Sequence, residues 1–136
     1  MSYSGPLEDR LMIRELIETY NDAVFRRDAN DWKDTWASDS EWQIFGQVIK
    51  GRANILKMWE GAMASLSYVG FFAIAGMINV TEKTAISRVY IRETLVQDGQ
   101  LRMLGGRYID DLIKVDNMWR FKCRRYEIIF DSDALT

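Results

Sequence analysis

The sequence predicts an α+β fold in which helices near the N-terminus pack inside a strongly curved, mostly antiparallel sheet. Two observations indicate this fold class. Apolar residues follow helical spacing in the first half of the chain, whereas four long segments rich in Val, Ile, Tyr and Phe follow from residue 68 onward. The pair Asp98-Gly99 between two of these segments is typical of a tight hairpin. A length of 136 residues fits one domain, residues 1–136.

The first helix is predicted from Leu7 to about Arg27. Pro6 precedes it and two acidic residues stand in its first turn, where the helix dipole favours negative charge. Its apolar residues recur at steps of three and four, and Tyr20 belongs to this stripe. One face of the helix, Tyr20 included, is therefore expected to lie against the core.

A short second helix is expected next, capped by Asn30 or Asp31. Trp32 and Trp36 are four residues apart, so a helix places both indoles on one face. We expect a strand at 40–45, then a connection, and then a third helix after Gly51 whose buried side carries Ile55, Trp59, Ala62 and Leu66.

The extended segments cover roughly 68–81, 84–97, 100–115 and 118–130. Gly105-Gly106 inside the third segment indicates a bulge or bend, which a sheet needs in order to curl around helices. In residues 71–80, both the odd-numbered and the even-numbered positions are mostly apolar. Because successive side chains of a strand point to opposite faces, both faces of this strand are expected to be covered. The helices can cover only one face. We therefore expect a homo-oligomer, most simply a two-fold dimer through the outer face of the sheet.

The last hairpin leaves two registers open. A three-residue loop at 116–118 sets Asp110 opposite Arg124, whereas a two-residue loop sets Asp110 opposite Cys123. An Asp paired with Arg stays ionised and can act as a base. The same pair can also be only a salt bridge between strands.

The chain contains no histidine. Serine-histidine triads, cysteine-histidine dyads and metal sites built on imidazole are therefore excluded, and catalysis must use carboxylates, Tyr, Lys or Arg. We expect no metal and no organic cofactor. The single Cys123 cannot form an internal disulfide.

The charge balance gives no sign of a polyanionic partner. Eighteen basic and 20 acidic residues give a net charge of -2, so nucleic acid is not expected as a partner. No apolar run has membrane length, and the N-terminus lacks the pattern of a secretory signal. A cytoplasmic protein that does not bind membranes is expected.

Motifs spread over most of the chain resemble the SnoaL-like group of the nuclear-transport-factor-2-like superfamily, which includes scytalone dehydratase, steroid delta-isomerase and hexachlorocyclohexane dehydrochlorinase. The resemblance implies a cone in which a bent sheet wraps a long helix and leaves a deep, mostly apolar pocket. The matching stretches are Asp9 to Ile17 with Tyr20, Trp36 before Asp39 to Trp42, Gly51-Arg52, Gly106 to Asp111, Trp119 to Phe121, and Arg124.

The resemblance also shows departures. The dehydratases and dehydrochlorinases use an Asp/His dyad, at positions that hold Phe25 and Phe71 here, and the position of the isomerase's base is nearest to Ile44. The isomerase's oxyanion hole pairs a Tyr with an Asp. Tyr20 and Asp110 match that pair. The family pattern favours the register that sets Asp110 opposite Arg124, and with it Tyr108 opposite Tyr126.

The resemblance and the register together lead to a functional hypothesis. Under this hypothesis the protein is a cofactor-independent dehydratase or isomerase that acts on a cyclic, apolar or aromatic small molecule by proton transfer. Tyr20 polarises a carbonyl, Asp110 is the acid or base, and Arg124 fixes its charge state. The alternative is a non-catalytic ligand-binding or assembly module that has lost the dyad. The expected substrate-binding residues are Phe25, Trp42, Met58, Trp59, Phe71, Tyr108 and Tyr126.

Overall fold

The computed structural model describes residues 2–135. Its helices are α1 (Leu7–Arg26), α2 (Ala29–Asp34) and α3 (Arg52–Ser65), and a 3-10 turn spans Ser132–Leu135. Seven strands form one sheet in the order β1-β4-β5-β6-β7-β2-β3. The strands are β1 (Tyr3–Ser4), β2 (Trp36–Ile44), β3 (Gln47–Lys50), β4 (Tyr68–Thr81), β5 (Thr84–Gln97), β6 (Gln100–Val115) and β7 (Met118–Asp131).

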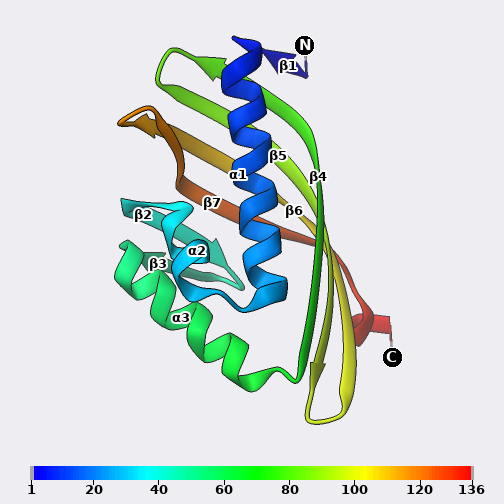
Figure 1. The fold of residues 1–136 in the computed structure, drawn as a ribbon. Coiled ribbons are helices and arrows are strands. Elements are labelled where there is room, and N and C mark those ends of the chain that lie inside the picture. The colour runs from blue at the N-terminus through cyan, green and yellow to red at the C-terminus, as the bar shows by residue number, and fades with distance from the viewer. Residues whose placement is uncertain (1, 136) are drawn as a thin grey trace.

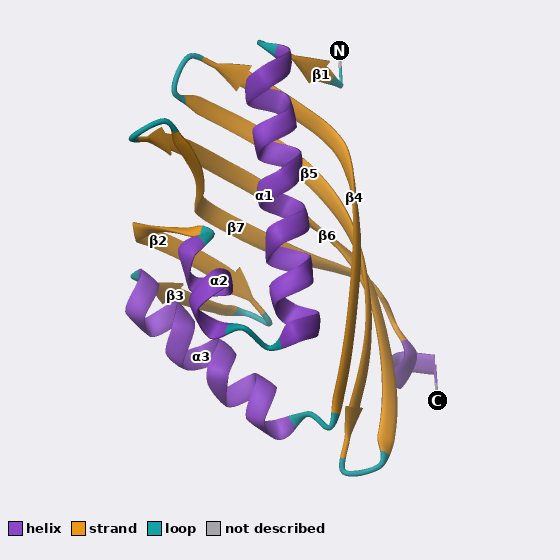
Figure 2. Cartoon of the chain, in the orientation of Figure 1, coloured by secondary structure: helices purple, strands orange, loops and turns teal. Residues whose placement is uncertain are grey.

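The four long strands β4 to β7 form an antiparallel meander that curves around α1 (Figure 1). β2 pairs in parallel with β7, and the short β1 pairs in parallel with β4. All three α-helices lie on the concave side of the sheet, and its outer face carries none of them (Figure 2). The predicted α+β fold with a curved, mostly antiparallel sheet is confirmed.

Three details of the N-terminal half differ from the prediction. The cap of α2 is Asp28, whose side chain accepts a hydrogen bond of 3.0 Å from the backbone N–H of Asp31. The helix α2 ends at Asp34, and Trp36 is the first residue of the strand β2. Trp32 and Trp36 therefore do not share a helix face, although their rings pack with centroids 5.7 Å apart. The expected connection at 46–51 contains the strand β3.

The core lies between α1 and the concave face of the sheet. The stripe predicted for α1 is buried there, including Tyr20 with 2% of its surface exposed. The N-terminal end of α1 is tied to the sheet by Asp9, whose carboxylate accepts hydrogen bonds from Lys114 (2.9 Å) and the Trp119 indole (3.0 Å). These contacts fix α1, and so fix the position of Tyr20.

Among residues 2–135, no helix is long and apolar enough to span a membrane.

Candidate functional site

An apolar pocket opens between α3, the C-terminal half of α1 and the concave face of the sheet. Its volume is about 110 Å³. We call it the apolar pocket and define it by its lining: Tyr20, Val24, Trp42, Ile44, Phe45, Trp59, Ala62, Met63, Leu66, Val69, Phe71, Glu93, Leu95 and Tyr108. Its exposed members, Phe45 and Ala62, place the mouth between α3 and the β2–β3 turn.

Glu93 is the only charged residue in this described lining. It extends from β5 in the row of inward-facing residues that also holds Val89, Ile91 and Leu95. The hydroxyl of Tyr126 donates a hydrogen bond of 3.4 Å to its carboxylate. Burial raises the pKa of Glu93 to about 7, and the hydrogen bond from Tyr126 offsets part of that rise. This carboxyl can therefore take up or release a proton near neutral pH.

Two tyrosines supply neutral hydrogen-bond donors to the same pocket. The indole N–H of Trp42 donates to the hydroxyl of Tyr108 at 2.9 Å, and Tyr108 is hydrogen-bonded to Tyr20. Because an indole can only donate, Tyr108 accepts from Trp42 and donates its own proton to Tyr20, which leaves the Tyr20 proton for another acceptor. Burial raises the pKa of both tyrosines. Both hydroxyls therefore remain protonated at neutral pH.

Behind the tyrosines lies a fully buried ion pair. Arg124 Nε and Asp110 Oδ1 are 2.8 Å apart, Arg124 Nη2 and Asp110 Oδ2 are 3.3 Å apart, and the Ser87 hydroxyl donates to Asp110 at 2.9 Å. Burial raises the pKa of Asp110 and Arg124 opposes the rise, while Asp110 raises the pKa of Arg124 against the effect of burial. Neither residue lines the apolar pocket.

The guanidinium of Arg124 is held by aromatic rings as well as by Asp110. Its Cζ lies 3.9 Å from the ring centroid of Tyr108, 4.1 Å from that of Phe121 and 4.5 Å from that of Tyr20. Cation–π contacts of this kind attract the cation to each ring face. Arg124 thereby holds the rings of Tyr20 and Tyr108, both of which line the apolar pocket.

The hairpin register combines both predicted alternatives. The β6–β7 turn has two residues, since Val115 pairs with Met118. Asp110 nevertheless pairs with Arg124, because the ladder shifts by one residue between Leu112–Phe121 and Asp111–Cys123. The expected pairing is thus confirmed, whereas the three-residue loop that was to produce it is wrong.

The match to known proteins covers most of the chain. Residues 5–125 match the family model of the SnoaL-like domain. This chain belongs to the SnoaL-like family. No functionally curated protein matches its sequence. The three similar solved structures described next are 17–22% identical to this SnoaL-like domain, so they show a shared fold.

One of these similar structures is a candidate scytalone dehydratase of Novosphingobium aromaticivorans, with a TM-score of 0.86, 20% identity, and coverage of 93% of this chain and 88% of that chain. Another is a candidate aromatic ring hydroxylase of the same organism, with a TM-score of 0.87, 22% identity and 93% coverage of both chains. A hexachlorocyclohexane dehydrochlorinase of type 2 has a TM-score of 0.84 at 17% identity, over 93% of this chain and 88% of that one.

The structure brings together most of the residues that the sequence singled out in this SnoaL-like domain. Those lining the apolar pocket are Tyr20, Trp42, Trp59, Phe71 and Tyr108. Tyr126 contacts the lining of the apolar pocket, because its hydroxyl donates a hydrogen bond to Glu93. Its ring stacks on that of Phe45 at the mouth, with centroids 6.2 Å apart. Asp110 and Arg124 stand behind it.

Phe25 and Met58 do not line the pocket, which corrects the prediction for both. Phe25 is 41% exposed near the end of α1 and packs edge to face on Phe72, with centroids 5.2 Å apart. Met58 is 36% exposed and precedes Trp59, which turns inward instead. The β4 residue in contact with Phe25 is Phe72. Phe71, the second residue at a position of the family's dyad, packs on Tyr20 instead, with ring centroids 5.7 Å apart.

Glu93 is a candidate site residue that the sequence analysis of this SnoaL-like domain did not identify. A signal was present. Glu93 continues the alternating apolar row of Val89, Ile91 and Leu95, so its side chain has to face inward. Within the part of the chain that the structure describes, no group of three or more Cys, Asp or Glu residues could hold a metal ion.

Proposed function

We propose that this SnoaL-like domain catalyses proton transfer, a dehydration or an isomerisation, on a small, cyclic, apolar molecule, with Glu93 as the group that moves the proton. One observation carries the proposal: a carboxyl stands alone among the aromatic and aliphatic side chains of the apolar pocket, with two neutral tyrosine hydroxyls in the same lining. This pairing of a base and hydrogen-bond donors suits chemistry next to a carbonyl group.

In an isomerisation of a cyclic ketone with a β,γ C=C bond, the ionised Glu93 removes a proton from the carbon between the carbonyl and the C=C bond. The electron pair of the broken C–H bond forms a new C=C bond to the carbonyl carbon, and the carbonyl electron pair moves onto the oxygen, which accepts a hydrogen bond from Tyr20. Protonated Glu93 then returns the proton to the γ carbon, the carbonyl re-forms, and the original C=C bond ends in the α,β position. A pKa near 7 allows Glu93 to serve both steps.

Asp110 and Arg124 take a different part in this proposal from the one expected. Both are fully buried and bonded to each other, so neither can reach a ligand in the apolar pocket. Arg124 packs on the rings of Tyr20 and Tyr108 instead. The ion pair is therefore assigned a positioning role, in which it holds the two hydroxyls in place.

The experiment is a screen of cyclic ketones for turnover with the wild type, followed by Glu93→Gln. The variant should lose at least about 100-fold in rate, within the range that acid–base catalysis contributes. Glu127→Gln is the matched control, since Glu127 bonds Arg107 and does not line the pocket. Equal rates for Glu93→Gln and the wild type would contradict the proposal.

A ligand-binding module without catalysis is the second candidate, and the size of the apolar pocket favours it. A volume of about 110 Å³ is well below the 300 Å³ at which typical small-molecule sites begin. Binding of ring compounds without turnover of any compound would support this candidate.

We also propose that the protein forms a homo-oligomer through the outer face of the sheet. Phe72 and Ile74 on β4 are 69% and 74% exposed, and Ile86 and Tyr90 on β5 are 48% and 42% exposed. A second copy suits this face because its carboxylates are already neutralised, as in the pair Asp111–Arg125 at 2.7 Å. Removal of this apolar surface from water is the driving force.

A further inference from the structure

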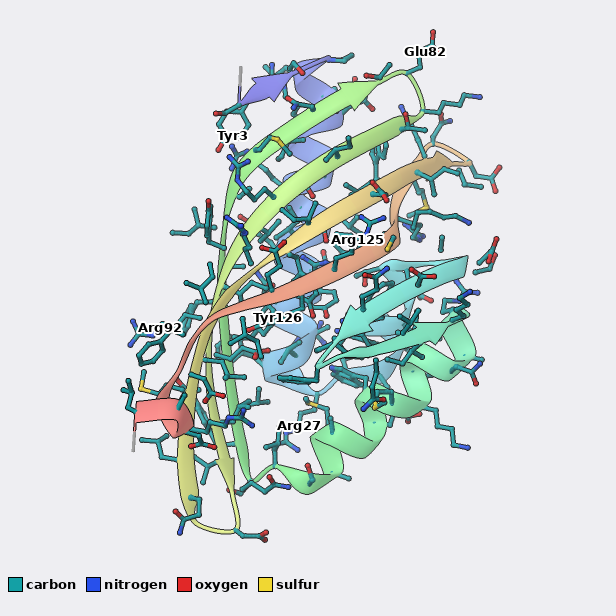
Figure 3. All side chains as sticks on the ribbon, turned by 180° about the vertical axis from the view of Figure 1, so that it is seen from behind. Tyr3, Arg27, Glu82, Arg92, Arg125 and Tyr126 are labelled. Atoms are coloured by element: carbon teal, nitrogen blue, oxygen red, sulfur yellow. The ribbon has the colours of Figure 1, made fainter. Side chains whose placement is uncertain are left out.

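The C-terminal end of α3 is clamped by an arginine from another helix. Arg27, directly after α1, donates hydrogen bonds of 2.8 Å from its two terminal nitrogens to the backbone carbonyls of Met63 and Leu66. Arg27 lies beside the end of α3 that leads into β4 (Figure 3). Met63 and Leu66 also line the apolar pocket, so the clamp holds one of its walls.

The clamp adds a charged donor at the C-terminal end of α3, where the Met63 carbonyl also accepts a hydrogen bond of 3.2 Å from the backbone N–H of Leu66. The last carbonyls of a helix lack intrahelical donors and carry the negative end of the helix dipole. No basic residue stands in the last turn of α3. Arg27 supplies the missing positive charge from outside the helix, with two charge-assisted hydrogen bonds.

The backbone of Arg27 is unusual for a residue with a side chain. Its φ of 55° and ψ of 39° lie in the left-handed region, where helices commonly end in glycine. A residue with a Cβ is disfavoured there and persists where its surroundings hold it. Backbone hydrogen bonds at the end of α1 go with this conformation, from Arg27 N–H to Val24 (3.2 Å) and from Asp28 N–H to Ala23 (3.0 Å), and the two bonds to α3 fix the Arg27 side chain.

Besides the clamp, the end of α3 is held by Ser67, whose backbone N–H donates a hydrogen bond of 2.9 Å to the carbonyl of Val96 on β5. The buried residues of the helix, Ile55 and Trp59, stand in its first eight positions. From residue 60 to residue 65 only Met63 is partly buried, and the others are exposed. Without the clamp, this turn can move away from the pocket while Trp59 stays stacked on Trp32, at 4.7 Å between ring centroids.

The volume of the pocket sets the size of what it can hold. An apolar cavity of about 150 Å³ takes up benzene. The apolar pocket has about 110 Å³, so it can take one ring after small side-chain adjustments, whereas two fused rings need a wall to move. The sheet, the buried part of α1 and Phe45 in the β2–β3 turn form the other walls, and α3 is the wall that Arg27 holds.

We infer that the apolar pocket takes molecules of a single ring, and that Arg27 is the specificity-determining residue that enforces this limit by fixing the C-terminal turn of α3. This rests on the proposed small-molecule function of the same pocket. It does not depend on turnover, because the limit acts on binding.

Calorimetric binding of phenol and 1-naphthol to the wild type, Arg27→Gln and Arg26→Gln tests the inference. Arg26 is the matched control, since it bonds only Asp22, Asp28 and Asp31. The wild type and Arg26→Gln should bind phenol at least tenfold more tightly than 1-naphthol. In Arg27→Gln this preference should fall at least tenfold. Similar affinity of the wild type for both probes, no binding of phenol, or an unchanged preference in Arg27→Gln would overturn the inference.

Two further measurements separate this inference from folding and from catalysis. Arg27→Gly removes the same hydrogen bonds and relieves the left-handed backbone, so it should relax the preference even if Arg27→Gln folds poorly. In unliganded Arg27→Gln, amides at 60–66 should exchange with deuterium faster than in the wild type while those at 52–59 keep their protection, and unchanged protection at 60–66 would contradict a turn fixed by Arg27. Glu93→Gln should keep the size preference, whether or not it loses turnover.

Discussion

Asp110 and Arg124 form their buried ion pair only because β7 carries one extra residue between the turn and the pair. Lys122 has no partner on β6, so β7 bulges there. Before the bulge, Trp119 and Phe121 face inward; after it, Arg124 and Tyr126 do. A regular two-residue hairpin would have turned Arg124 outward. The bulge therefore places the cation against Tyr20 and Tyr108, and the Tyr126 hydroxyl against Glu93.

Replacement of Asp110 by Asn should destabilise the fold strongly, because it leaves the buried Arg124 charge without its counter-ion. The expected loss is about 3–5 kcal/mol in the free energy of unfolding. Asp111→Asn is the control: its partner Arg125 is 41% exposed, and loss of that pair should cost less than about 1 kcal/mol. Urea unfolding of the two variants measures the difference. Equal losses would contradict the structural importance of the buried pair.

The pKa of Glu93 makes stability depend on pH. Burial raises this pKa from 4.5 to about 7 in the folded protein, so the folded state holds the proton more tightly than the unfolded state. Stability from this group is fully present below 4.5 and is lost as the pH rises through about 7. Glu93→Gln should thus gain stability relative to the wild type between about pH 5 and pH 8, by at most about 3 kcal/mol. A relative stability that does not change with pH would argue against a buried, titrating carboxyl.

Tyr20→Phe should impair turnover more than binding. The hydroxyl is proposed to donate to an oxygen whose negative charge develops during the reaction, and loss of such a donor typically costs about 100- to 1,000-fold in rate. The ring remains, so packing on Arg124 and Phe121 is kept. Steady-state kinetics should show a lower kcat with a similar KM. An unchanged kcat would remove Tyr20 from the mechanism.

Ile74→Lys should dissociate the proposed homo-oligomer, because it puts a charge into the apolar outer face. Val48→Lys is the control, since Val48 is 57% exposed on β3 and stands apart from β4. Light scattering at micromolar concentration should give an oligomer for the wild type and the control, and the monomer mass for Ile74→Lys. A monomeric wild type would leave the apolar outer face without an explanation.

The regular part of the fold follows from the sequence pattern. Alternation and turn residues predict the strands from residue 68 onward to within one residue, and the spacing of apolar residues predicts α1. The end of α2 cannot be predicted in this way, since Trp36 continues the helical spacing of Trp32 although it belongs to β2. Local spacing cannot show that the backbone of Trp36 pairs with Phe121 on a strand far along the chain.

The sequence predicts the candidate site less completely than it predicts the fold. The bulge at Lys122 has no local signature, so the register of the hairpin and the neighbours of Arg124 depend on tertiary packing. Phe25 lies at the end of α1, where a small change in helix direction decides between the pocket and the surface. Glu93 could have been found, because parity alone places its side chain inside.

The proposed mechanism requires that the Glu93 carboxyl titrates near neutral pH inside the apolar pocket. NMR titration of its side-chain carboxyl carbon measures this pKa, with Glu93→Gln used to assign the signal. The proposal predicts a pKa of about 7, and a lower value in Arg27→Gly if the opened wall admits water. A Glu93 pKa at its ordinary value of 4.5 in the wild type would contradict the claim.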